Sequence, residues 1–176
     1  MKSTKIEAGN KFPPLIVNSI TGGQSDISKP EGSASWRMVI VYRGRFCPLC
    51  TQYLNQLAEH TEALGNMGVD IAVVSADSKA QLEDQLPKLN INFPIYYGLS
   101  LEQMKGLGVY ISHPRSPEET DHPFSEPGLF VINDSGTVQV VDISNNPFVR
   151  PELNSLVSGL DWIRKNDYPI RGSYEY

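Results

Sequence analysis

The chain has 176 residues, 40% of them hydrophobic and 20% charged, with a formal net charge of −5. This length and apolar content suit one globular domain with a sizeable core and exclude a disordered chain. The acidic balance without a long basic run gives nucleic-acid binding no support, and no apolar run reaches the roughly 18 residues of a membrane span.

The start of the chain, residues 1–10, has no apolar core followed by a small-residue cleavage site, so no signal peptide is predicted. We therefore expect a cytoplasmic protein. In a reducing compartment, the two cysteines are not expected to form a permanent disulfide.

An irregular lead-in at 1–35 precedes a region in which predicted strands and helices alternate. The run at 36–42 is apolar and β-branched apart from Arg37, which is typical of a central strand buried on both faces. The pattern predicts, in chain order, a strand at 36–42, a helix at 52–64, a strand at 70–75, a helix at 79–89, a strand at 93–97, a helix at 101–107, a loop at 112–127, a hairpin of 129–133 with 137–143, and a helix at 151–165 with Pro151 in its first turn.

This order of elements predicts an α/β protein, a three-layer α/β/α sandwich with a mixed central sheet. The chain has no internal repeat, low-complexity tract or linker. Residues 1–176 are therefore expected to form a single domain.

The only two cysteines, Cys47 and Cys50, lie between the predicted strand at 36–42 and the helix that follows it. A cysteine just before a first helical turn meets free backbone N–H groups and the positive end of the helix dipole, which favour the thiolate. Pro48 suits a helix start because its missing N–H costs nothing there. We therefore predict Cys47 as the attacking thiol and Cys50, one turn further on, as the resolving thiol.

Three other interpretations of the pair are weaker. A zinc site lacks a second pair of ligands, because His60, His113 and His122 are scattered over a helix and a loop. A stabilising disulfide would remove only about 2 kcal/mol of chain entropy from so short a loop. Inert, packed thiols remain the third alternative. No metal or other cofactor is expected.

Five segments around and beyond the cysteines resemble the peroxiredoxin-like (AhpC/TSA, redoxin) branch of the thioredoxin-like superfamily. They are Val41-Tyr-Arg-Gly-Arg-Phe-Cys-Pro-Leu-Cys50, Ile71-Ala-Val-Val-Ser-Ala-Asp-Ser78, Phe93-Pro-Ile95, Leu107-Gly-Val109 and Pro127-Gly-Leu-Phe-Val-Ile-Asn-Asp-Ser-Gly136. The resemblance implies a thioredoxin-like fold and an antioxidant thiol oxidoreductase with Cys47 in the place of the peroxidatic cysteine.

The chain departs from that family's pattern at several positions. Ile40 stands where the family has a proline and Gly44 where it has a threonine that helps to position peroxide. Pro127 occupies the place of an arginine and looks instead like the cis-proline of thioredoxins, which faces the cysteine pair. Arg43 or Arg45 is expected to supply the missing positive charge. The predicted substrate contacts are Pro127, Arg43, Arg45 and Phe46. For Phe46, packing is the alternative role.

Several other residues near the motif have structural interpretations. Asp77 is predicted to cap the helix at 79–89. His113 and His122 are expected to be solvated loop residues. Arg150 resembles the arginine that precedes the last helix of peroxiredoxins, and we expect it in a structural ion pair. The aromatic tail at 168–176 is expected to pack on a neighbour, which makes a homodimer a prediction.

The resulting hypothesis is an enzyme that reduces peroxides or protein disulfides through a Cys47–Cys50 disulfide cycle, reopened by an external thiol reductant of the thioredoxin or glutaredoxin type. The alternative is a non-enzymatic redox sensor or binding module on the same fold. Sustained turnover distinguishes the two.

Overall fold

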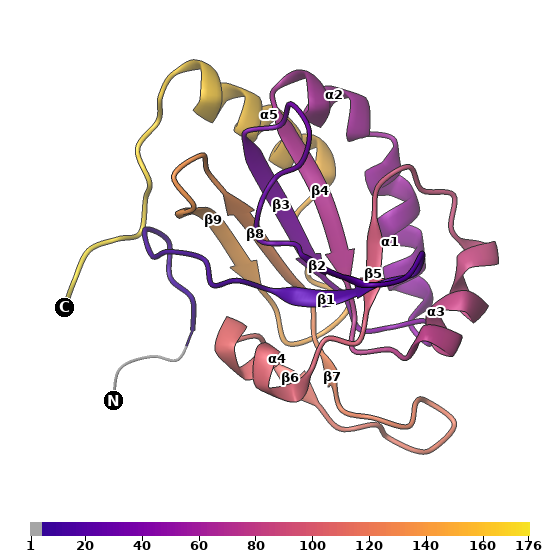
Figure 1. Cartoon of the computed structure of the whole chain (residues 1–176). Coiled ribbons are helices and arrows are strands. Elements are labelled where there is room, and N and C mark those ends of the chain that lie inside the picture. The colour runs from indigo at the N-terminus through magenta and orange to yellow at the C-terminus, as the bar shows by residue number, and fades with distance from the viewer. Residues whose placement is uncertain (1–4) are drawn as a thin grey trace.

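The computed structural model describes residues 5–176 (Figure 1). Residues 1–4 lie outside that range. They belong to the predicted lead-in at 1–35 and to the segment 1–10 in which no signal peptide is predicted. The elements are, in chain order, β1 (Ile16–Ser19), β2 (Gln24–Asp26), β3 (Trp36–Val41), α1 (Pro48–Ala58), α2 (Thr61–Asn66), β4 (Val69–Val74), α3 (Lys79–Gln85), the 3-10 turn η1 (Leu86–Lys88), β5 (Ile95–Tyr97), α4 (Leu101–Leu107), β6 (Ile111–Ser112), β7 (Phe124–Ser125), β8 (Gly128–Ile132), β9 (Val138–Ile143) and α5 (Leu153–Lys165).

Seven strands form one mixed sheet in the order β2-β1-β5-β4-β3-β8-β9. β3, β4 and β5 run parallel, whereas β1 and β8 join them antiparallel at either side. β8 and β9 form the predicted hairpin. The remaining strands, β6 and β7, pair with each other in a separate two-stranded ribbon.

Helices cover both faces of this sheet because its central strand is apolar on both sides. β3 sends Met38 and Ile40 into a core shared with α1, α2, α3 and α5, and Val39 and Val41 into a second core shared with α4 and the N-terminal segment. Alternating side chains of a strand point to opposite faces, so one apolar run supplies both cores. The predicted three-layer α/β/α sandwich with a mixed sheet is therefore confirmed (Figure 1).

Three local predictions differ from the structure. The lead-in is not irregular throughout, since β1 and β2 form a hairpin at the edge of the sheet. The helix predicted at 52–64 starts at Pro48 and is broken after Ala58, so that α2 is a separate helix. α5 begins at Leu153 with Glu152 as its N-cap, which leaves Pro151 just outside the helix.

Two further features concern residues 5–176 as a whole. None of their helices is both long and apolar enough to cross a membrane. Among the same residues, no group of three or more His, Cys, Asp or Glu side chains is arranged to hold a metal ion.

Candidate active site

Four sheet connections meet at one edge of the sheet, and they carry the candidate site. Val41 ends β3 and pairs with Val74 at the end of β4 and with Gly128 at the start of β8. Gly128 in turn pairs with Ile143 at the end of β9. The segments that follow β3, β4 and β9, together with the one that precedes β8, are thereby brought side by side. They supply the cysteines, Asp77, Arg150 and Glu126.

Cys47 is the N-cap of α1. Its backbone is extended, with φ −103° and ψ 100°, and its Sγ accepts a hydrogen bond from the Cys50 backbone N–H at 3.3 Å. Pro48 occupies the first turn of the helix. The sulfur therefore takes the place of the usual capping oxygen, at the end of the helix where the dipole favours negative charge. Both thiols are reduced and buried, with Cys47 2% and Cys50 0% exposed.

Arg150 lies directly against the two sulfurs. Its Nη2 is 2.9 Å from Cys50 Sγ and 3.8 Å from Cys47 Sγ. The side chain is held in place by a bond from its Nε to the Pro147 carbonyl at 3.1 Å and by the ring of Tyr53, 5.2 Å from the guanidinium carbon. The Tyr53 hydroxyl donates to the Pro151 carbonyl at 2.7 Å, which ties this segment to α1.

The two thiols are pushed in opposite directions by these surroundings. The pKa of Cys47 is lowered to about 5, chiefly by a hydrogen bond from the Cys50 thiol, with Arg43, the Cys50 backbone N–H and Arg150 adding to the effect against the cost of burial. Burial raises the pKa of Cys50, and its bond to Cys47 raises it further. At neutral pH, Cys47 is thus the thiolate and Cys50 the thiol that donates to it.

Arg43 is the second cation at Cys47, and the sequence predicted it. Its guanidinium helps to lower the pKa of Cys47, and its Nε faces Glu126 Oε2 at 3.0 Å without the alignment of a hydrogen bond. A second carboxylate, that of Glu119, lies 3.9 Å from Arg43 Nη2. The guanidinium also lies over the Phe46 ring at 5.3 Å, which places the predicted contact Phe46 beside Arg43 in a packing role.

The other two predicted contacts are placed differently. The guanidinium of Arg45 points to Asp84 at 2.7 Å, and no hydrogen bond or ion pair within residues 5–176 joins it to either sulfur. Pro127 lines a small cavity with Arg150 and Tyr53. Every peptide bond among the described residues is trans, so Glu126–Pro127 lacks the cis bond of the thioredoxin proline, a point that the sequence left open.

Gly44 is held in a backbone conformation that favours glycine, with φ +144°. A Cβ at this position would lie 2.7 Å from Asp77 Oδ1 and 2.9 Å from the Phe46 ring. The position that resembles the family's threonine therefore has no room for a side chain while Asp77 occupies the space in front of it.

Three structural interpretations from the sequence are corrected here. Asp77 is not the cap of α3, because Ser78 is, in a capping box with Gln81. His122 is not a solvated loop residue, since its Nε2 lies 3.1 Å from the buried Asp77 carboxylate. Arg150 makes no ion pair with a carboxylate among the described residues and lies on the thiols instead. The only sequence signal for Arg150 was its place before the last helix.

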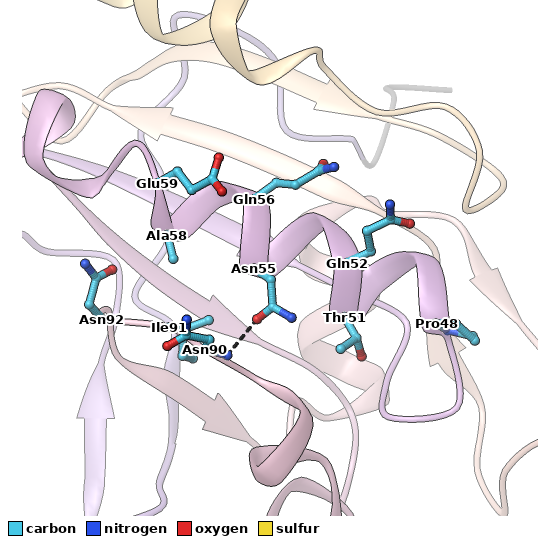
Figure 2. A pocket seen from close by; sticks show the side chains of 10 residues that line it. All are labelled: Pro48, Thr51, Gln52, Asn55, Gln56, Ala58, Glu59, Asn90, Ile91 and Asn92. Atoms are coloured by element: carbon cyan, nitrogen blue, oxygen red, sulfur yellow. Dashed lines mark hydrogen bonds between the residues drawn. The ribbon is translucent and has the colours of Figure 1, made fainter.

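Two open grooves flank α1 near the cysteines. One, of about 690 Å³, runs between α1 and residues 90–92, and Figure 2 shows its amide-rich lining, with Pro48 at the end nearest Cys47. The Asn55 side-chain oxygen accepts from the Asn90 backbone N–H across it at 2.7 Å. The other, of about 740 Å³, lies between α1 and residues 147–154 and includes Arg150. Leu49, Phe148 and Val149 expose apolar surface beside the thiols.

A family model and several solved structures are similar to this chain. The model of the AhpC/TSA family matches residues 8–141. A search of curated proteins found no match.

Solved structures with a similar fold include a mutant of the peroxiredoxin 6 of Arenicola marina, with TM-score 0.76, 17% identity, and 93% of this chain and 76% of that chain covered. A peroxiredoxin-like protein from Aquifex aeolicus has TM-score 0.72 and 18% identity over 90% of this chain and 88% of that one. The AhpC of Mycobacterium tuberculosis has TM-score 0.69 and 16% identity over 94% and 97%. At these identities the likeness is one of fold.

Proposed function

Because this chain belongs to the AhpC/TSA family, we propose that it is a thiol peroxidase in which Cys47 attacks the peroxide and Cys50 resolves the oxidised product. The observation that carries the proposal is the unequal state of the two thiols. Cys47 is a helix-capping thiolate with a pKa of about 5, whereas the pKa of its neighbour Cys50 is raised. A nucleophile that is ionised at neutral pH beside a protonated partner suits two successive attacks in a fixed order.

In the first half-reaction, the Cys47 thiolate attacks one oxygen of the peroxide O–O bond. A new S–O bond forms as the O–O bond breaks, which oxidises the sulfur to a sulfenic acid. The leaving oxygen carries away the bonding pair and becomes water or an alcohol after taking a proton from solvent. The guanidiniums of Arg43 and Arg150 supply positive charge near the sulfur while this negative charge moves across the site.

In the second half-reaction, Cys50 loses its proton and attacks the Cys47 sulfenic sulfur. A Cys47–Cys50 disulfide forms and hydroxide leaves as water. Arg150 Nη2, at 2.9 Å from Cys50 Sγ, is placed to offset the charge that appears on this sulfur. An external dithiol of the thioredoxin or glutaredoxin type then reduces the disulfide and restores both thiols, so the cycle needs no bound cofactor.

Burial supports a small peroxide as the first substrate. Because Cys47 is only 2% exposed, a peroxide reaches its sulfur more readily than the bulky disulfide of another protein. The second candidate, a protein disulfide, is favoured by two other observations. Gly44 leaves no room for a peroxide-binding hydroxyl, and Leu49, Phe148 and Val149 present exposed apolar surface next to the thiols.

The test is stopped-flow oxidation of the reduced protein by hydrogen peroxide and by a model disulfide. A higher rate constant with peroxide, followed by sustained consumption with thioredoxin as reductant, supports the proposal. A higher rate constant with the disulfide would instead support a protein disulfide as the substrate. One stoichiometric oxidation without cycling indicates a redox sensor and contradicts an enzyme of either kind.

Single-cysteine variants assign the order of attack. Peroxide-treated Cys50→Ser protein should hold a sulfenic acid on Cys47 that a dimedone-type reagent labels. The matched Cys47→Ser protein should not be labelled. Labelling of Cys50 in Cys47→Ser would reverse the assigned roles.

A further inference from the structure

Asp77 is a fully buried carboxylate that faces the turn between β3 and Cys47. Its Oδ2 accepts from the Arg45 backbone N–H at 2.7 Å, and both of its oxygens pack against Gly44. Among residues 5–176, the ionisable basic side chain that pairs with it is His122, at 3.1 Å, and the pair is an ion pair when His122 is protonated. Because a buried charge is costly without a partner, the proton on His122 bears directly on how Asp77 is held.

The contacts of His122 require that proton. Its Nδ1 lies 2.8 Å from the Pro123 carbonyl, and its Nε2 lies 3.1 Å from Asp77 Oδ1 and 3.2 Å from Gln81 Oε1. Gln81 Oε1 is an acceptor here because the Ser78 backbone N–H donates to it at 2.8 Å. Both ring nitrogens therefore face acceptors, which a neutral imidazole with one N–H cannot satisfy.

The charged groups around His122 favour the same state. Asp77 faces it from the connection after β4, and Asp121 lies 3.9 Å away on its own loop. Gln81, from α3, is uncharged and donates its amide N–H to Asp121 at 2.9 Å. In agreement, the pKa of His122 is raised above its ordinary value, chiefly by the hydrogen bond to Asp77.

His122 also connects two segments that converge on Arg43. Its own segment, between β6 and β8, carries Glu119 and Glu126, the carboxylates that face the Arg43 guanidinium at 3.9 and 3.0 Å. Asp77, on the other side of the bond, fixes the backbone next to Arg43. The His122–Asp77 hydrogen bond thus links the turn that contains Arg43 to the loop that carries the carboxylates facing the Arg43 side chain.

We propose that His122 and Asp77 form a proton-dependent latch that positions Arg43 beside the Cys47 sulfur, which makes both of them positioning residues. The inference rests on the proposed role of Cys47 as the nucleophile and assigns a pH control to it. When His122 loses its proton, one of its two ring nitrogens faces an acceptor without an N–H, the positive charge beside the buried Asp77 carboxylate is lost, and the latch weakens. Cys47, with a pKa of about 5, is already ionised at the pH where His122 titrates. Deprotonation of His122 therefore changes the position of Arg43 and not the amount of thiolate.

The first test uses the full-length protein without peroxide. In an NMR titration, the His122 ring and the Arg45 backbone amide should change together at one pH, above the ordinary value for histidine. In Asp77→Asn the His122 titration should move to lower pH. An Arg45 amide that does not follow His122 in the wild type would overturn the latch, and this measurement needs no variant to fold.

The second test is the single-turnover rate of Cys47 oxidation by hydrogen peroxide as a function of pH. In the wild type, the rate constant should fall by about three- to tenfold as the pH rises through the His122 titration, as expected for the net loss of one ordinary hydrogen bond. The step should be absent from His122→Gln and present in His113→Gln, a matched change at an exposed residue of the same loop. A step of equal size in His122→Gln would overturn the positioning role.

The two tests separate the inference from the function on which it rests. No oxidation of Cys47 by peroxide at any pH would refute the proposed peroxidase, and the NMR titration would still decide the latch. Co-titration of His122 and Arg45 with a flat oxidation profile would refute the control of Cys47 while leaving the peroxidase in place.

Discussion

The arginines near the two thiols come from positions that differ from that of the family's arginine. Pro127 stands where the resemblance places an arginine, yet Arg150 arrives from a segment 100 residues beyond Cys50 in sequence. Arg43 approaches from the turn before Cys47 and is held by Glu126, the residue next to Pro127. Two cations thus stand near the sulfur, although neither occupies the position of the family's arginine.

Replacing Arg150 by Gln removes the charge that touches both sulfurs. We expect the pKa of Cys47 to rise by about one unit and the peroxide oxidation rate at neutral pH to fall by about tenfold. Ultraviolet titration of the thiolate and stopped-flow oxidation measure the two effects. Arg150→Lys should keep part of the rate, and Arg171→Gln, at an exposed arginine of the C-terminal tail, should change neither quantity. An Arg150→Gln protein with wild-type titration and rate would show that Arg43 suffices.

Gly44→Thr restores the residue type that the resemblance leads one to expect. The new side chain would meet Asp77 and Phe46 in a turn whose φ is +144°, so we expect the free energy of unfolding to fall by at least about 2 kcal/mol, without faster peroxide oxidation. Urea unfolding gives the measurement. Gly106→Ala is the control, because a Cβ there meets nothing within 4 Å and the residue lies in α4. Unchanged stability with faster oxidation would mean that the turn accepts a side chain.

At the scale of elements, two short helices begin with the same capping pattern. Ser78 opens α3 with Gln81, and Ser100 opens α4 with Gln103, each as a complete capping box. In α3 the cap leaves Asp77 free for the active-site turn. Asp77 has the residue type of a helix cap, but Ser78 caps the helix instead. The Asp77 carboxylate can therefore bond the Arg45 backbone N–H.

Ser78→Ala and Ser100→Ala should therefore behave alike in stability. Each removes one cap and is expected to lower the free energy of unfolding by about 1 kcal/mol, measured by urea denaturation. Neither should alter the rate of Cys47 oxidation, since neither serine touches the thiols or Arg43. A loss in Ser78→Ala several times that in Ser100→Ala would indicate that the cap also holds the Asp77 turn.

At the scale of the whole molecule, the site depends on sheet order. The ends of β3, β4 and β9 and the start of β8 lie at one edge, so four different connections supply the residues of the site. The protonation of Cys47 is therefore linked to the folding equilibrium, because the unfolded chain has none of these contacts.

The stability of the reduced protein should depend on pH through Cys47. Its folded-state pKa of about 5 lies below the roughly 8.5 of an unfolded cysteine, so between these values the unfolded chain binds more protons. The contribution is full above about pH 8.5 and is lost as the pH falls through about 5. Urea unfolding of the wild type against Cys47→Ser, both reduced, should give a difference that grows with pH over this range. A constant difference would contradict a stabilised thiolate.

The layers of the fold and the helix-capping position of Cys47 follow from local sequence patterns. The β-branched run at 36–41 forms the central strand, and Cys47 followed by Pro48 marks the helix N-terminus, because these properties depend on neighbouring residues. Local patterns also predicted α4 and the β8–β9 hairpin. The break between α1 and α2 and the β1–β2 edge hairpin were not foreseen, because they depend on packing against the sheet.

Which polar side chains meet at the cysteines depends on how distant segments of the chain fold together. Arg43 and Arg45 look equivalent in sequence, yet Arg43 helps to lower the pKa of Cys47, whereas Arg45 pairs with Asp84 at the surface. The sequence predicts ordinary local roles for three other residues of the site: a helix cap for Asp77, a solvated loop position for His122 and an ion pair for Arg150. Their actual partners lie between 32 and 103 residues away along the chain. Hydrogen bonds and charges act over a few ångströms in space, and only the folded sheet edge brings these groups within that distance.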